Sequence, residues 1–169
     1  NNTTLDIDGN IDIDGTLNLA ASNSICDVSG NWNDFDGNLV ITGFPLVELT
    51  GTGTITSNPA TNQFGRLHIK NGLYTAASNI SISSNFWIQN NGQFEVSTFT
   101  ISQTSSFNQF KVETGCVLLF SNTGTFISQS EVNGGFNTSD GTITFTAAGT
   151  LQIANESPNI GTFNPGTGT

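Results

Sequence analysis

Apolar and polar residues alternate with a period of two along almost the whole chain. Clear examples are Leu5-Asp6-Ile7, Leu67-His68-Ile69, Phe94-Glu95-Val96 and the threonines 142, 144 and 146, which enclose Ile143 and Phe145. This alternation predicts short β-strands with one buried and one solvated face. Dipeptides typical of tight turns separate the runs: Asp8-Gly9, Asp14-Gly15, Asp36-Gly37, Asn71-Gly72, Asn91-Gly92, Asn133-Gly134 and Asp140-Gly141. We therefore expect an all-β chain.

Two segments of the chain repeat each other. Residues 64–72 (FGRLHIKNG) align with residues 107–115 (FNQFKVETG), which places Leu67 on Phe110 and Gly72 on Gly115. Internal repeats indicate a stacked architecture, in which each unit buries its apolar face against its neighbours.

A second pattern aligns three turn glycines, Gly37, Gly92 and Gly124, and puts Trp32 and Trp87 at the same distance before the first two. The spacing between these repeats is irregular. A solenoid accommodates irregular spacing, because each coil has to match only the next one. The shared position of the tryptophans favours a packing role for both.

The two repeats predict a single domain over residues 1–169, a parallel β-solenoid (β-helix) with irregular coils. An Ig-like or jelly-roll β-sandwich is the alternative, since strands separated by glycine turns read similarly in both folds. At the amino end the hexads LDIDGN, IDIDGT and LNLAAS fit successive faces of a β-helix, and they also fit a β-hairpin.

Composition excludes several classes of function. Asn, Thr, Ser and Gly form about half of the 169 residues, which leaves few strong helix formers. The net charge of −10 argues against nucleic-acid binding, which needs a basic surface. No apolar run approaches the ~20 residues of a membrane span. The chain contains no Met, which suggests a processed protein or a segment of a longer one.

Several stretches resemble the repeats of very long secreted bacterial surface proteins. They are GNW at residues 30–32 followed by a turn and an aliphatic strand, GTGTITS at 51–57, the F-x-x-L-x-I-x-N-G segment at 64–72, and GTFNPGTGT at 161–169. The resemblance implies a β-solenoid region of an exported adhesin-like or filament-forming protein. It brings no catalytic residues, because its motifs are structural.

Neither end of the chain shows a polar capping unit. A solenoid needs such caps, because an uncovered terminal coil exposes strand edges and core. Two explanations are open: the natural chain continues, for example past Thr169, or the ends stack on other subunits and form a filament by strand addition.

Seven of the eight Asp residues lie within the first 36 positions, Asp34 among them. The carboxylates of Asp6, Asp8, Asp12 and Asp14, projecting from neighbouring strands, offer the oxygen ligands that Ca²⁺ prefers. Solvated strand faces and Asp-Gly turns explain the same residues without a cation. A structural calcium site is thus one of two interpretations.

Cys26 and Cys116 raise the question of a disulfide, which is common in exported proteins. In a regular solenoid of roughly 20 residues per coil they lie about four coils apart, at ~4.8 Å per strand. A disulfide needs Cα atoms within about 7 Å. Both residues also lie in apolar segments. We expect two buried, free thiols.

Arg66, His68 and Lys70 occupy alternate positions of one strand, which predicts that all three face water. The sequence pairs no acidic residue with His68, and a single histidine supplies neither a metal-ligand cluster nor a catalytic triad. We therefore expect no enzymatic activity.

The adjacent residues Phe86 and Trp87 point to opposite faces of their strand. One is expected in the core and the other in a position to stack on a sugar ring.

Taken together, these patterns predict a non-enzymatic structural protein: a subunit or repeat region of an extracellular bacterial filament or cell-surface adhesin, extended by end-to-end strand stacking. The alternative is a polysaccharide-binding module of a secreted protein, which uses Trp87 and calcium. No cofactor other than calcium is expected.

Overall fold

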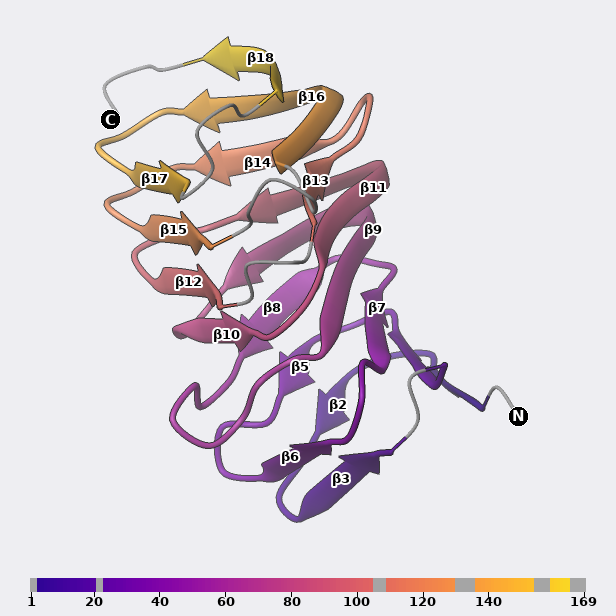
Figure 1. Ribbon diagram of the computed structural model, residues 1–169. Helices are drawn as coiled ribbons and strands as arrows, with labels where there is room; N and C mark the ends of the chain where they lie inside the picture. Colours follow the sequence, from indigo (N-terminus) through magenta and orange to yellow (C-terminus); the bar gives the residue numbers. More distant parts are fainter. Residues whose placement is uncertain (1–2, 21–22, 105–108, 130–135, 154–158, 165–169) are drawn as a thin grey trace.

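The chain folds into a parallel β-solenoid. The structure, a computed structural model, describes residues 3–20, 23–104, 109–129, 136–153 and 159–164. Within these ranges every regular element is a strand, and all paired strands run parallel. Successive turns of the chain stack on one another from the amino to the carboxyl end (Figure 1). The all-β solenoid prediction is confirmed, and the sandwich alternative is wrong, because sandwiches are built from antiparallel pairs.

Each turn of the solenoid, here called a coil, contributes two or three strands. The first coil comprises β1 (Thr4–Ile7), β2 (Ile11–Asp12) and β3 (Thr16–Leu19), and the second comprises β4 (Ile25–Val28), β5 (Trp32–Asn33) and β6 (Asn38–Ile41). The following strands are β7 (Leu46–Leu49), β8 (Gly53–Thr56), β9 (Arg66–Ala76), β10 (Ile80–Ile82), β11 (Phe86–Glu95), β12 (Thr100–Gln103), β13 (Phe110–Val112), β14 (Val117–Phe120), β15 (Thr125–Ser128), β16 (Phe136–Phe145), β17 (Thr150–Ile153) and β18 (Asn159–Asn164).

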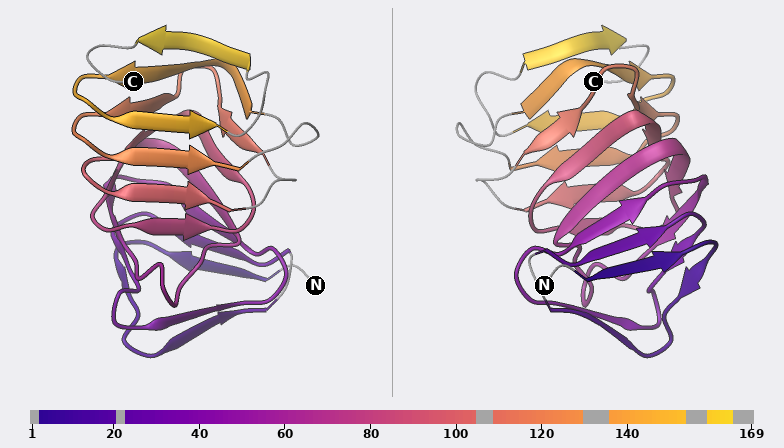
Figure 2. Two further views of the ribbon diagram at one scale, coloured as in Figure 1. Left: turned by 60° about the vertical axis from the view of Figure 1, so that its left-hand side comes forward. Right: turned by 90° about the vertical axis from the view of Figure 1, so that its right-hand side faces the viewer.

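The strands form stacked sheets around a common core. One large sheet runs from β1 through β4, β7, β9 and β11 to β13 and β16. A separate four-stranded sheet, β10-β12-β15-β17, covers the opposite side of the carboxyl-terminal part, and β3 pairs with β6 in the amino-terminal part (Figure 2). Because β1, β2 and β3 pair with β4, β5 and β6 and not with each other, the hexads are β-helix faces and the hairpin interpretation is wrong.

In-register stacking places like residues on top of one another in the core. Leu67, Phe86 and Phe110 follow one another from β9 to β11 to β13. The rings of Phe86 and Phe110 lie 5.8 Å apart, and Phe126 packs 5.2 and 4.7 Å from them. Contacts of this kind between aromatic rings stabilise the core beyond the burial of area.

The dipeptides Asn71-Gly72 and Asn91-Gly92, predicted to separate strands, lie inside the long strands β9 and β11. Asn71 and Gly72 have φ of 53° and 79°, and Asn91 has φ of 63°. Asn and Gly tolerate this left-handed conformation. The chain bends here, and pairing with the adjacent coil continues on both sides of the bend. These dipeptides thus make solenoid corners, not hairpins.

The first repeat is confirmed, since Leu67 and Phe110 lie in one core column, two coils apart. The equivalence of Trp32 and Trp87 is wrong. Trp32 pairs with Ile55 and is buried in the core, whereas Trp87 lies on the outer face beside His68. The coils differ in length. Two residues at the same distance from a turn glycine therefore need not lie in the same in-register column of the solenoid.

Candidate functional site

The outer face of the large sheet carries one in-register column of charged and aromatic side chains. We call this column the outer ladder; it runs from β1 to β13 through Asp6, Asp27, Glu48, His68, Trp87 and Lys111. Strand alternation points these residues outward while their neighbours enter the core. The ladder changes along the solenoid from acidic, through aromatic, to basic.

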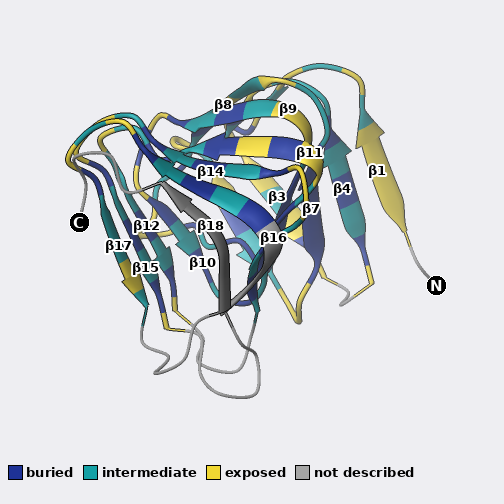
Figure 3. Cartoon of the chain, turned by 90° about the horizontal axis from the view of Figure 1, so that it is seen from above, coloured by how far each residue is buried: buried dark blue, intermediate teal, exposed yellow. Residues whose placement is uncertain are grey.

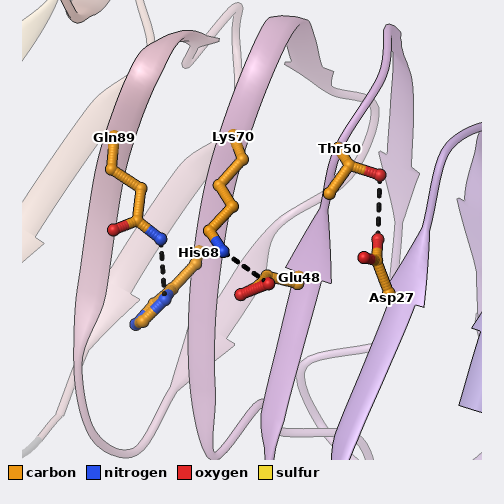
Figure 4. Close-up of polar contacts among 6 residues, drawn as sticks. All are labelled: Asp27, Glu48, Thr50, His68, Lys70 and Gln89. Carbon is orange, nitrogen blue, oxygen red and sulfur yellow. Dashed lines mark hydrogen bonds and ion pairs between the residues drawn. The ribbon is translucent and has the colours of Figure 1, made fainter. Parts of the chain in front are cut away.

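Three polar contacts cross between adjacent coils in the middle of this ladder, from β4 to β11 (Figure 4). Each contact joins a ladder residue to the residue two positions further along the adjacent strand. Thr50 Oγ1 donates to Asp27 Oδ1 at 2.8 Å, Lys70 Nζ donates to Glu48 Oε1 at 2.6 Å, and Gln89 Nε2 lies 3.3 Å from His68 Nδ1. The repeated diagonal pattern ties successive coils together on their solvent side.

His68 points outward but is buried, with 6% of its surface exposed. Its ring stacks on Trp87 at 4.7 Å with an interplanar angle of 9°. Burial, together with the charges of Lys70 and Arg66, lowers the pKa of His68 to about 3. The imidazole is therefore neutral at pH 7, and its Nε2 is buried without a hydrogen-bond partner.

The prediction that Arg66, His68 and Lys70 all face water is thus wrong for His68. Arg66 and Lys70 are partly exposed, as predicted. The indole of the next coil covers His68, a contact between coils that the strand's own alternation does not reveal.

Trp87 lies between two neighbours of the ladder. His68 stacks on it from β9, and Lys111 Nζ from β13 lies 5.5 Å from the ring centroid. Phe86, the preceding residue, is fully buried in the core, as expected for one member of the pair. Glycan stacking at Trp87 stays a prediction, and its ring already has a side chain on each face.

A polar hollow of about 460 Å³ lies at the corner between β11 and β13, and Lys111, which lies over the ring of Trp87, is part of its lining. Lys111 and Glu113 form an ion pair of 2.9 Å at its wall. Its lining supplies amide, hydroxyl and charged groups, which bind hydroxyl-rich ligands by hydrogen bonds: Asn90, Asn91, Lys111, Glu113 and Thr114.

The four predicted calcium ligands, Asp6, Asp8, Asp12 and Asp14, are all exposed on the first coil. The carboxylate of Asp12 accepts a 2.8 Å hydrogen bond from Asn33 Nδ2. Among the described residues no three His, Cys, Asp or Glu side chains are grouped so as to hold a metal ion. The calcium site stays a prediction.

Cys26 and Cys116 are both buried and free, as predicted. Burial raises the pKa of Cys26 to about 11 and also raises the pKa of Cys116. Both thiols are therefore protonated at neutral pH and lack the thiolate character of reactive cysteines.

Asp34 belongs to a buried polar group that the sequence reasoning missed. We counted it with the other acidic residues of the amino end, yet none of its surface is exposed. Alternation offered a signal, because Asp34 lies two positions after the core residue Trp32 and therefore points the same way. The polar groups around its carboxyl belong to Trp32, Ser57 and Asn62, all buried.

No helix in the described part of the chain is long and apolar enough to cross a membrane. Comparisons with protein-family models, with curated proteins and with solved structures find no match to this chain. The function is therefore argued from the fold and its surfaces.

Proposed function

We propose that this chain is a non-enzymatic structural protein, a subunit or repeat region of an extracellular bacterial filament or cell-surface adhesin that is extended by end-to-end stacking of β-coils. The observation that carries the proposal is the open core of the first coil. Leu5 is exposed and Ile7, Ile11 and Leu17 are only partly buried, whereas their in-register partners in the second coil are buried: Cys26, Val28, Trp32 and Leu39. Ile13 and Leu19 are the inward-pointing residues of the first coil that are already buried.

The contrast is clearest in the column that begins at Leu5. Leu5 is 43% exposed, whereas its in-register partner Cys26 and the next residue, Val47, are fully buried. Leu17 on β3 is likewise only partly buried, while its partner Leu39 is buried. Figure 3 shows β1 largely in the colour of exposed residues. A further coil stacked on the first would bury this apolar surface.

A small hollow opens at this end of the core. It has a volume of about 190 Å³ and lies between β1 and β3. Its walls include the apolar side chains of Leu5, Leu17, Leu19 and Ile25. An apolar side chain of a stacked coil fits such a hollow.

The backbone pairing of the first coil also favours stacking at this surface. In the described residues β1, β2 and β3 each pair with one strand, on the side of the second coil. Their other edges offer backbone N–H and C=O groups for parallel strand addition. A second copy of the chain, or the preceding coil of a longer protein, satisfies both the edges and the exposed core.

Electron microscopy of the isolated chain tests the proposal. We expect fibres or short stacks in negative stain, whose abundance rises with protein concentration. A Leu5→Lys variant places a charge in the exposed core column and should abolish the stacks. The matched control is Thr16→Lys, which adds the same charge at an exposed position of β3 in the same coil, outside the hollow, and should leave them intact.

A monodisperse monomer at high concentration would contradict stacking of the chain on itself. If both variants lost the stacks equally, the added positive charge, and not its place in the core column, would be the cause. Circular dichroism of each variant shows whether the solenoid has kept its fold.

The second candidate is polysaccharide binding, favoured by the polar hollow at Asn90, Asn91 and Lys111. A glycan array tests it directly. Hits that weaken in Lys111→Ala and persist in Arg66→Ala would support this function, and an array without hits would count against it.

A further inference from the structure

A carboxyl group lies buried at a corner of the second coil. Asp34 directly follows β5, and its backbone N–H donates to the carbonyl of Thr56 in the adjacent coil at 3.0 Å. This bond holds the backbone of Asp34 in the same ladder of hydrogen bonds as β5, so its side chain keeps the inward direction of Trp32. None of its surface is exposed. Asp is rarely found fully buried unless it is paired.

Three polar residues surround the carboxyl group: Trp32, Ser57 and Asn62. Asn62 is already committed, since its amide donates to the backbone carbonyls of Asp34 and Gly37 and accepts from the N–H of Leu39. Trp32 Nε1, Ser57 Oγ and both carboxyl oxygens of Asp34 are buried, and none of these four atoms has a partner in hydrogen-bonding geometry.

No cation compensates a charge at this place. Of the segments packed against Asp34, β8, the loop at 58–65 and residues 76–79 contain no ionisable side chain. β2 contributes Asp12 and the turn itself contributes Asp36, both of them exposed carboxyl groups. An ionised Asp34 would therefore be a buried, unpaired charge, which is strongly destabilising.

The neutral acid fits the neighbouring groups better than the carboxylate does. An ionised carboxylate is an acceptor only, with about four sites to fill, whereas a protonated one also donates an O–H. The indole N–H of Trp32 suits the carbonyl oxygen of the acid. The hydroxyl of Ser57 can either donate a hydrogen bond to the acid or accept one from its O–H.

We propose that Asp34 is an uncharged carboxylic acid in the folded protein at neutral pH, and that it forms a proton-dependent polar network with Trp32 and Ser57 at this corner. The proposal is independent of what the solenoid assembles with. Burial raises the pKa of the Asp34 carboxyl above its ordinary value, and the nearby donor groups of Ser57, Trp32 and Asn62 offset part of this rise.

The network makes the amino-terminal coils sensitive to pH in a defined direction. A pKa that is higher in the folded than in the unfolded state means that folding takes up a proton. The stabilisation is complete below the unfolded pKa of about 3.9. It is lost as the pH rises through the folded pKa.

Carbon-13 NMR of the carboxyl groups tests the protonation state. We expect one Asp carboxyl, identified as Asp34 by its absence in Asp34→Asn, to keep the chemical shift of the protonated form at pH 7. An Asp34 resonance with the chemical shift of an ionised carboxylate at pH 7 would overturn the proposal.

Thermal unfolding of variants gives the second test. Asp34→Asn replaces the acid by a neutral group of the same shape, so its Tm should equal or exceed that of the wild type at pH 8. Its advantage should shrink or reverse at pH 4. The Asp36→Asn control, at an exposed carboxyl two residues away, should show no such crossover. The other titratable groups are the same in the wild type and in Asp34→Asn, so their effects cancel in the difference between the two Tm values.

Asp34→Ala separates the charge from the polar contacts. It leaves Trp32 and Ser57 without their neighbour and should lower the Tm at both pH values. An Asp34→Asn variant that is less stable than the wild type at pH 8 and equally stable at pH 4 would show that the ionised carboxylate is the native form, and would overturn the proposal.

Discussion

The first coil and the coils built from β9 and β11 contain the same kind of inward-pointing residue in very different surroundings. Leu5 and Phe86 lie in one core column, yet Leu5 is 43% exposed and Phe86 is fully buried. Phe86 lies between two coils, one on each side. Among the described residues, Leu5 has a neighbouring coil on one side only. Burial in this column thus depends on the number of neighbouring coils.

The outer ladder repeats this lesson on the solvent side. Asp6, in the first coil, is exposed, whereas His68 is covered by the tryptophan of the next coil. Both side chains point away from the core. A polar residue on an outer face is therefore buried or exposed according to the residue stacked beside it.

The largest expected effect comes from truncation of the interior column. Phe86→Ala removes ring contacts with Phe94, Phe110 and Phe126 and should lower the free energy of unfolding by about 3–5 kcal/mol. Urea denaturation measures the loss. Phe44→Ala, at a phenylalanine with half of its surface exposed, is the control and should change little. Equal losses would remove the contrast between interior and exposed positions.

Acidification should weaken the middle of the ladder. The pKa of His68 falls to about 3 in the folded protein, below its unfolded value, so its contribution is present above pH 6.5 and is lost as the pH falls. The loss amounts to about 2 kcal/mol at pH 5. Denaturation at pH 7 and pH 5 measures it, and His68→Gln should remove this dependence. An Asp6→Asn change in the same ladder should leave it intact. The contribution of Asp34 to stability has the opposite pH dependence, because it is lost as the pH rises.

Leu5→Ala should cost only about 1 kcal/mol in the isolated chain, because a partly exposed leucine contributes less than the ~1.5–3 kcal/mol of a buried one. The same substitution should weaken stacks strongly, because a stacked coil covers the column. Comparison of the unfolding curve with sedimentation of the assemblies separates these effects. A large loss in the monomer would mean that Leu5 is already buried.

The smallest effect is expected at the ion pair of Lys111, on β13, and Glu113, which lie 2.9 Å apart. Both side chains are partly exposed, so loss of this pair in Lys111→Gln should cost about 0.5 kcal/mol. Repeating the measurement in high salt should reduce the difference, since salt screens exposed charges. A cost that does not change with salt would point to packing of the lysine stem instead.

Much of the fold was readable in the chain, because alternation and turn dipeptides are local signals. The match of residues 64–72 with 107–115 correctly predicted a shared core column. The match of Trp32 with Trp87 failed, because coils of unequal length shift one pattern against another. Of the candidate site residues, Phe86 and both cysteines behave as predicted, and the environments of His68 and Asp34 were not foreseen.

The sequence by itself determined that this chain is all-β, that it stacks its own repeats, and that inward and outward residues alternate along its strands, since each follows from a period of two and from local turn chemistry. Tertiary structure alone decided which outward residues are covered, which acid is buried, and where the core lies open. Those properties depend on the register between coils, and the register follows from loop lengths and from the packing of one coil on the next.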